Sequence, residues 1–232
     1  MAYHEIIERL TLEFEQASEL ESAEKMAQYM RNLFPFYGIP KTKRAVIVKP
    51  ILKQLVAVST AENYEVIALE LWNKPQREFQ YVSIEYLEKV EKLWRRQSTL
   101  ELFENMIVTK SWWDSVDTIA SHCVGKYFRT WPQDVEQTIN RWNTHGNMWL
   151  NRTAIIFQLS YKSHTDTALL AHVIDTHSRS KEFFIQKAIG WALRQYAYTD
   201  ADYVRTFVET HTLAPLSKRE ALKNMVKSMQ IT

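Results

Sequence analysis

Apolar residues recur along the whole chain every three or four positions, with polar residues between them. This spacing gathers the apolar side chains on one face of a helix, because an α-helix turns once every 3.6 residues. Glycine and proline, which interrupt helices, number only 4 and 6. The pattern predicts helices over residues 3–18, 22–34, 42–58, 61–73, 76–95, 98–108, 111–128, 133–142, 147–162, 166–177, 181–197, 200–210 and 216–229.

The predicted helices are separated by short polar links, several of which contain proline. Pro75 and Pro132 stand where a first helical turn begins, a position that proline tolerates. Pro50 instead lies inside the apolar pattern of 42–58, so we expect either a kink or a helix boundary there. Since a many-stranded sheet would need more turn-forming residues, the sequence predicts an all-α fold.

A short pattern recurs in several of these helices. Residues 79–84, 150–155 and 185–189 share an apolar residue, an amide, a large polar or aromatic residue and then small or apolar residues, and 114–119 falls at the missing register. Helix pairs that recur at roughly 35–45 residues are typical of HEAT-like repeats, which stack into curved arrays. We therefore expect residues 1–232 to form one HEAT-like repeat domain of antiparallel helix pairs, with these four segments on equivalent helices.

The formal net charge of +2 is unevenly distributed. Residues 1–30 contain 2 basic and 7 acidic residues, whereas the remainder of the chain is basic overall. An acidic segment followed by a basic body suits a protein that binds a polyanion, although ordinary solvated helix faces would carry similar charges.

Several classes of protein are disfavoured by the residues that the chain lacks. A single cysteine, Cys123, excludes a disulfide framework, a zinc ribbon and a four-cysteine iron–sulfur cluster within the chain. The histidines show no metal-ligand spacing on a shared helix face, and the dispersed glycines form no phosphate-binding loop. No apolar run is long enough to span a bilayer, and the N-terminal residues lack a secretory signal pattern. We expect a cytoplasmic protein without a metal ion or cofactor.

The helix predicted over 111–128 carries one candidate site. Ser111 is expected to be its N-cap. Trp113 and Asp117 lie four residues apart and therefore share a face, where an aromatic ring beside a carboxylate could bind a cationic substrate. A packed tryptophan beside a solvated aspartate is the commoner explanation of such a pair. The adjacent face is an apolar stripe that should point to the core, made of Trp112, Val116, Ile119 and Cys123.

Two further helices carry basic residues of interest. Arg152 stands among apolar residues, so its guanidinium either forms a structural ion pair or binds a ligand anion such as phosphate. On the helix 181–197, Lys187, Trp191 and Arg194 share a face, and Phe184 lies one turn before Lys187. Basic residues interleaved with aromatic ones are typical of nucleic-acid surfaces, although an amphipathic helix with snorkelling cations has the same pattern.

Four segments together resemble one known family. Residues 108–117, 180–191 and 213–221, with Ala27-Gln28-Tyr29-Met30 near the start, are similar to the AlkD-type alkylpurine DNA glycosylases, and the likeness runs over essentially the whole chain. The resemblance implies a basic concave groove that holds duplex DNA. It also implies excision of cationic N3- and N7-alkylated purines, such as 3-methyladenine and 7-methylguanine, by a monomer that needs no cofactor.

The resemblance also assigns roles to individual residues. Asp117 is expected to be the catalytic carboxylate, and Trp113 and Trp191 the aromatic walls around the deoxyribose of the lesion. The expected DNA contacts are Arg152 on a phosphate, Tyr29 on the N-terminal helices, and Phe184, Lys187 and Arg194 in the groove. The chain departs from the family at Pro40 and Ser160, where a member carries glutamine and lysine, so two DNA contacts are not carried over.

Two other functions fit the same sequence. A catalytically inactive relative that binds unusual DNA structures would keep the fold and the basic groove. A helical-repeat scaffold for protein interactions would keep only the fold. The presence of Asp117, Trp113, Arg152 and Trp191 together favours the enzyme.

Overall fold

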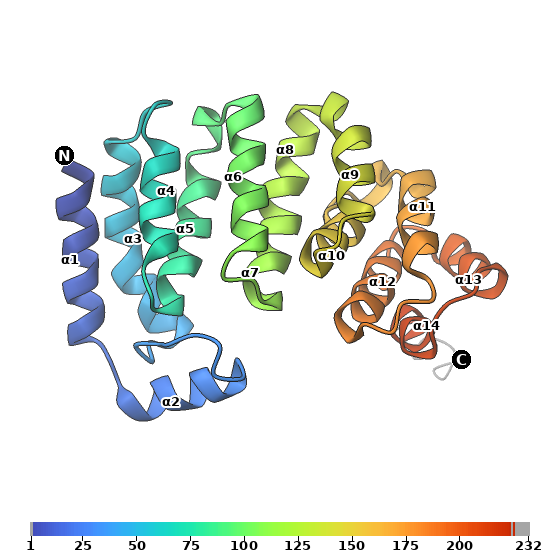
Figure 1. Ribbon diagram of the computed structural model, residues 1–232, viewed down its shortest axis with the longest axis horizontal. Coiled ribbons are helices and arrows are strands. Elements are labelled where there is room, and N and C mark those ends of the chain that lie inside the picture. The colour runs from blue at the N-terminus through green and yellow to red at the C-terminus, as the bar shows by residue number, and fades with distance from the viewer. Residues whose placement is uncertain (1, 224, 226–232) are drawn as a thin grey trace. The chain divides into compact units, whose positions relative to one another are not determined.

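The computed structural model describes residues 2–223 and residue 225, and every regular element in this part of the chain is a helix or a helical turn (Figure 1). The predicted all-α fold is confirmed. The chain divides into two compact units, unit 1 (Met1–Leu102) and unit 2 (Phe103–Thr232). The expectation of a single repeat domain stays a prediction. Within residues 2–223 and 225, no helix has the length and apolar character needed to cross a membrane.

Unit 1 follows the predicted helices closely, with three differences. The helix predicted over 22–34 runs from Leu20 to Tyr29. The helix predicted over 76–95 ends at Lys89 and is followed by a 3₁₀ turn. The helix that contains Pro50 is continuous, because only the hydrogen bond to the exposed Val46 carbonyl lacks a donor. The elements are α1 (Ala2–Gln16), α2 (Leu20–Tyr29), α3 (Lys41–Ala57), α4 (Tyr64–Asn73), α5 (Arg77–Lys89), the 3₁₀ turn η1 (Glu91–Leu93) and α6 (Arg96–Val108), whose end enters unit 2.

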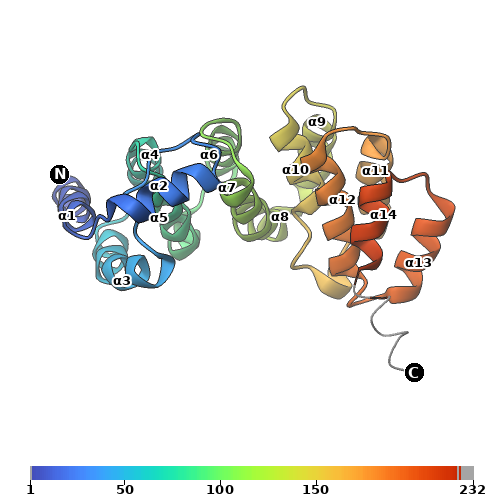
Figure 2. The ribbon, with the colours of Figure 1, turned by 90° about the horizontal axis from the view of Figure 1, so that it is seen from below.

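Unit 2 contains the remaining helices. In Figure 2, α10, α12 and α14 lie side by side, and contacts join α9 and α11 to α10 and α13 to both α12 and α14. The predicted helix 216–229 extends beyond the described residues. The elements are α7 (Trp113–Thr118), the π-helical segment η2 (Ile119–Val124), α8 (Gly125–Thr130), η3 (Pro132–Asp134), α9 (Val135–Asn143), α10 (Met148–Ile156), η4 (Lys162–His164), α11 (Thr167–His177), α12 (Phe183–Tyr196), α13 (Ala201–Thr210) and α14 (Pro215–Leu222).

The amide side chain that recurs in the sequence pattern donates hydrogen bonds to carbonyls at the end of the preceding helix. Gln80 on α5 donates from Nε2 to the carbonyls of Trp72 and Lys74, at the end of α4, over 2.7 Å each. Asn151 on α10 donates to three carbonyls at the end of α9, the first of them that of Trp142 at 2.8 Å. A helix leaves its last carbonyls without intrahelical donors, and these amides supply them. The internal repeat therefore has a physical basis, an amide that closes the C-terminus of the preceding helix.

The same position on α12 behaves in a related way. Gln186 donates from Nε2 to the carbonyl of Ser180, in the turn that follows α11, over 2.8 Å. The fourth segment, 114–119, has Ser115 at this position, and its hydroxyl donates to the Trp112 carbonyl. The tryptophans whose carbonyls are capped in the first two cases, Trp72 and Trp142, are almost completely buried. Burying a large apolar side chain stabilises a fold by roughly 1.5–3 kcal/mol.

A buried carboxylate orders the link between α2 and α3. Glu78 on α5 accepts hydrogen bonds from the backbone N–H groups of Tyr37, Gly38 and Ile39. Gly38 has φ +84°, and a Cβ there would lie 2.2 Å from the Glu19 carbonyl oxygen, so only glycine fits this turn. The start of α3 is thereby fixed on the helix α5.

Candidate functional site

The candidate site begins on the helix that carries Asp117. α7 starts at Trp113, with Trp112 as its N-cap, so the expectation that Ser111 caps this helix is wrong. The Ser111 hydroxyl instead donates to the Ile107 carbonyl and closes α6. The helix continues from α7 through the π-helical η2 into α8. π-Helical turns are rare and are often found at functional sites.

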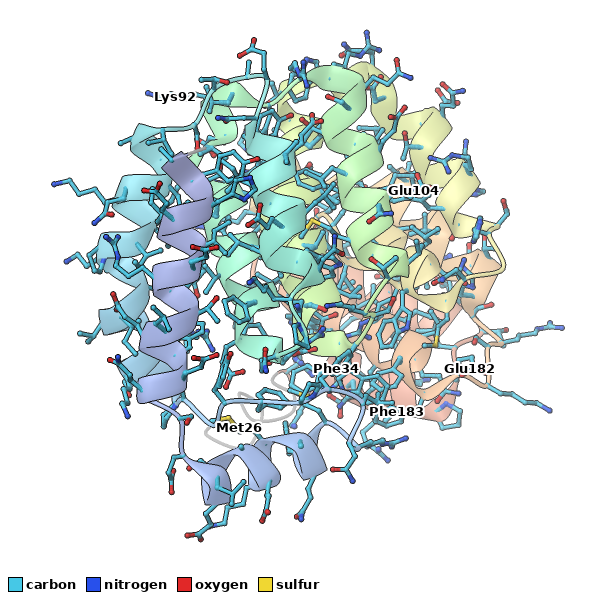
Figure 3. The ribbon with its side chains drawn as sticks, turned by 60° about the vertical axis from the view of Figure 1, so that its left-hand side comes forward. Met26, Phe34, Lys92, Glu104, Glu182 and Phe183 are labelled. Atoms are coloured by element: carbon cyan, nitrogen blue, oxygen red, sulfur yellow. The ribbon has the colours of Figure 1, made fainter. Side chains whose placement is uncertain are left out.

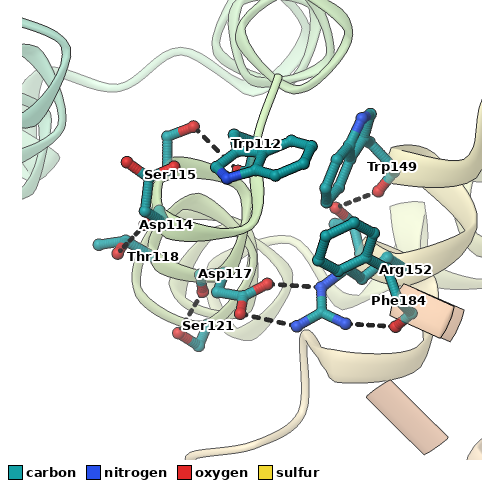
Figure 4. Close-up of polar contacts among 10 residues, drawn as sticks. Trp112, Asp114, Ser115, Asp117, Thr118, Ser121, Trp149, Arg152 and Phe184 are labelled. Carbon is teal, nitrogen blue, oxygen red and sulfur yellow. Dashed lines mark hydrogen bonds and ion pairs between the residues drawn. The ribbon is translucent and has the colours of Figure 1, made fainter. Parts of the chain in front are cut away.

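Asp117 and Arg152 form a two-pronged ion pair, shown in Figure 4. Arg152 on α10 donates from Nε to Oδ1 and from Nη2 to Oδ2 of Asp117, each over 2.7 Å. Its Nη1 donates to the carbonyl of Phe184 on α12. The sequence left open whether Arg152 forms an ion pair or binds a ligand, and the structure shows the ion pair. The guanidinium thus ties α7, α10 and α12 together around one carboxylate.

Burial differs between the two partners. The Arg152 side chain is 5% exposed and that of Asp117 is 15% exposed, so the carboxylate is the partner that a ligand can still reach. Burial raises the pKa of the Asp117 carboxyl above its ordinary value, and the hydrogen bonds from Arg152 lower this pKa. The nearby Asp114 adds a smaller increase. Arg152 therefore limits the cost of keeping a buried carboxylate charged.

Three aromatic rings adjoin this ion pair. Trp112, Trp149 and Phe184 form a closed triangle, with ring centroids 5.8 Å apart for Trp112 and Trp149 and 5.1 Å apart for each pair with Phe184. The Cζ atom of Arg152 lies 6.0 Å from the centre of the Phe184 ring. The sequence analysis proposed Phe184 but missed Trp149. The sequence feature that could have identified Trp149 is its position immediately before the repeat segment 150–155.

The two tryptophans expected at the sugar lie on helices that both pack against α10. Trp113 is the first residue of α7, one helical turn before Asp117, and it is half-buried. Trp191 is also half-buried and lies on α12, one turn after Lys187. Their expected contacts with a deoxyribose stay predictions.

Lys187 and Arg194 of α12 meet a carboxylate that the sequence analysis did not single out. Glu220 on α14 accepts from Arg194 at 2.7 Å and lies 3.2 Å from the Lys187 Nζ. The hydrogen bond from Arg194 lowers the pKa of Glu220. Gly190, between the two cations, lets α14 approach, because a Cβ there would lie 2.4 Å from the Glu220 Cβ and 2.9 Å from the Ser217 carbonyl oxygen. Both cations therefore stabilise the packing of α12 on α14, and their expected DNA contacts stay predictions.

Tyr29 belongs to unit 1, where it ends α2 and is 71% exposed. Pro40 is the residue that precedes α3, and Ser160 follows α10 on the surface. The exposed ring of Tyr29 is accessible to a ligand, and its expected DNA contact stays a prediction.

Two cavities of unit 2 are lined by residues other than Asp117. One of about 260 Å³ is lined by α10, α11 and α12, and another of about 720 Å³ lies beside α8 and the η4 turn. In the described part of the chain, no three carboxylate, histidine or cysteine side chains are grouped to hold a metal ion. The Asp117 carboxylate is partly exposed, and the aromatic cluster of Trp112, Trp149 and Phe184 lies beside its ion pair. Such a carboxylate can stabilise positive charge that develops on a ligand placed against it.

Comparison with known proteins gives a consistent result. The family model described as DNA alkylation repair enzyme matches residues 10–225. A solved structure, a predicted DNA alkylation repair enzyme from Enterococcus faecalis, is similar with 31% identity and a TM-score of 0.84, over 90% of this chain and 97% of that one. No match was found among curated proteins. The chain therefore belongs to the family of DNA alkylation repair enzymes.

Proposed function

We propose that this protein is a DNA glycosylase that hydrolyses the N-glycosidic bond of cationic N3- and N7-alkylated purines in duplex DNA. The observation that carries the proposal is the Asp117 carboxylate, which Arg152 fixes with two hydrogen bonds beside an aromatic cluster while leaving it partly exposed. Membership of a DNA alkylation repair family supports the choice of substrate. The proposed location is the cytoplasm, and the proposed active form is a monomer.

The chemistry requires one carboxylate. Alkylation at N3 or N7 places a positive charge on the purine, which can then leave without being protonated. As the bond breaks, the sugar gains oxocarbenium character, as in other glycoside hydrolysis. A carboxylate held against the sugar stabilises that charge and can orient the attacking water, and losing such a preorganised group costs roughly 10²–10³ in rate.

Arg152 has two parts in this proposal. It positions the carboxylate and favours its charged form, because an opposite charge within hydrogen-bond distance lowers the pKa of an acid. A guanidinium carries five N–H donors, of which the contacts to Asp117 and Phe184 use three. Two N–H groups are left, but the Arg152 side chain is only 5% exposed, so the expected phosphate contact would have to be made through that small exposed part.

The aromatic residues complete the proposed site. Trp113 and Trp191 would flank the deoxyribose and interact with its developing charge through their ring faces. Phe184 would maintain the aromatic surface beside Arg152. Lys187, Arg194 and Tyr29 are the proposed backbone contacts, and the first two remain available only in part because both meet Glu220.

The test is release of methylated bases from duplex DNA treated with a methylating agent. The wild type is expected to release 3-methyladenine or 7-methylguanine, and Asp117→Asn to lose at least about 10²-fold in rate. Asp202→Asn, at a highly exposed carboxylate of α13, removes the same charge and should leave the rate unchanged. Wild-type rates in Asp117→Asn would refute the role of this residue. Binding of duplex DNA without any base release would instead identify a non-catalytic relative.

A further inference from the structure

One helix of unit 1 stands apart in its charges. α3 carries five basic residues and no acidic one. The helices around it, α1, α2, α4 and α5, each carry at least two glutamates. Among α1 to α5, only α3 carries basic residues without an acidic one, so its charge is a local feature of unit 1.

Two of the five cations of α3 have partners inside unit 1. Arg44 is buried, lies 3.5 Å from the Glu85 carboxylate and stacks 4.5 Å from the centre of the Tyr81 ring. The Lys43 ammonium donates to the Ala17 carbonyl over 3.0 Å. These contacts explain why Arg44 and Lys43 are present, and the remaining lysines of α3 need another reason.

Lys49 and Lys53 lie on the side of α3 that is opposite its buried residues. Residues 44, 48, 51, 52 and 55 face the core, so positions 46, 49 and 53 point outward, and all three are exposed. Within residues 2–223 and 225, neither lysine makes an ion pair or a hydrogen bond. Like charges four residues apart on a helix repel each other and destabilise it slightly. The pair thus weakens the isolated helix with no compensating carboxylate.

We propose that the exposed face of α3, formed by Lys49, Lys53 and the 75% exposed Val46, is a contact surface for the phosphate backbone of duplex DNA. Charge complementarity supports the assignment, because two neighbouring lysines without acidic partners gain favourable interaction energy from the regularly spaced phosphates of DNA. An apolar side chain beside the row suits the sugars between phosphates. The inference rests on the proposed function only for the identity of the polyanion, and the surface contributes affinity without contributing to base release.

The position of α3 is compatible with this role. Figure 2 shows it at one edge of unit 1, and its packing contacts are with α1 and α5, on its buried side. The Glu78 carboxylate fixes the backbone just before α3, so the lysines project from a rigid support. A rigid support lowers the entropy that binding must remove.

The test is the salt dependence of binding to undamaged duplex DNA. Each phosphate contact contributes about 0.9 to the slope of log K against log salt concentration. The variant Lys49→Gln/Lys53→Gln is expected to lower this slope by about 1–2 and to weaken binding at least about fivefold near 0.1 M salt. Its melting temperature should be equal to or slightly above that of the wild type, because a like-charge pair is removed.

The matched control removes two other exposed lysines of unit 1. Lys89 and Lys92 are flanked in sequence by Glu88 and Glu91, and Figure 3 shows Lys92 projecting away from the ribbon. Lys89→Gln/Lys92→Gln should change the slope by less than about half as much. Equal effects of the two double variants would overturn the proposal, as would an unchanged slope in the α3 variant. Because no lesion is present, this outcome is independent of whether the protein releases methylated bases.

Discussion

Replacing one partner of the Asp117–Arg152 pair should damage both folding and chemistry, and a second substitution should separate the two. In Asp117→Asn the Arg152 guanidinium, which is only 5% exposed, loses its counter-charge. A buried cation without a partner is far less favourable than a buried pair. Arg152→Met, added to the same chain, removes that cation and leaves a side chain that fills similar space.

The magnitude follows from the burial of the pair. Breaking a buried ion pair by removing one partner costs about 3–5 kcal/mol. That is a large part of a typical stability of about 5–15 kcal/mol. For a chain of this length, each kcal/mol lowers the melting temperature by roughly 2–4 °C, so Asp117→Asn should melt about 6–20 °C below the wild type. The double variant should recover at least about half of that loss.

Two assays on the same four proteins test this reasoning, namely thermal unfolding and single-turnover base release by the wild type, both single variants and the double variant. The double variant should regain stability and stay inactive, because it still lacks the carboxylate. If Asp117→Asn has the same melting temperature as the wild type, Asp117 does not stabilise the buried charge of Arg152. If the double variant recovers base release, the stabilisation of the sugar does not come from Asp117.

Three further outcomes are expected. Base release should fall as the pH drops through the raised pKa of Asp117, and Arg152→Met should move this acid limb to higher pH, because the hydrogen bonds that lower the pKa are gone; a shift to lower pH would contradict this. Glu220→Gln should remove about 1.5–3 kcal/mol of stability near neutral pH. The pKa of Glu220 lies below its ordinary value of 4.5, so the stability that Glu220 contributes is complete above pH 4.5. This stability is lost as the pH falls through the lowered pKa of the folded state. Acid unfolding of the variant and the wild type will measure the loss. Gly190→Ala should destabilise by about 1–3 kcal/mol because its Cβ meets Glu220 and the Ser217 carbonyl, whereas Gly146→Ala, with nothing within 4 Å, should be close to neutral in chemical denaturation.

Local patterns predicted the helices well, because apolar periodicity and proline placement act within a few residues. The differences arise where a competing hydrogen bond or the packing of other helices decides. Ser111 has the side chain of an N-cap, but its hydroxyl donates to the Ile107 carbonyl of α6. It therefore caps the end of α6 and not the start of α7. Pro50 sits inside α3 because packing of the buried residues on α1 and α5 outweighs one missing ladder bond.

The sequence named candidate residues but not the contacts between them. Asp117 was singled out by its spacing from Trp113 and Arg152 by its apolar neighbours. Their contact joins residues 35 positions apart and could not be inferred from either helix alone. The partner of Lys187 and Arg194 was missed for the same reason, since Glu220 reaches α12 only when α14 packs on Gly190. Trp149 was missed because an aromatic residue next to a core pattern is usually part of the core.

The π-helical segment Ile119–Val124 has a consequence for comparing this chain with its relatives. Each α-helical residue turns the chain by about 100°, and a π turn accommodates an extra residue, so the rotational phase changes across the segment. A helical wheel drawn from Trp112 onward places Cys123 correctly in the core, but side chains of α8 plotted on the same wheel are displaced by about one residue. If a relative lacks the extra residue, an alignment without a gap in this segment would still match Asp117 correctly. It would match each side chain of α8 with one that points toward a different neighbour.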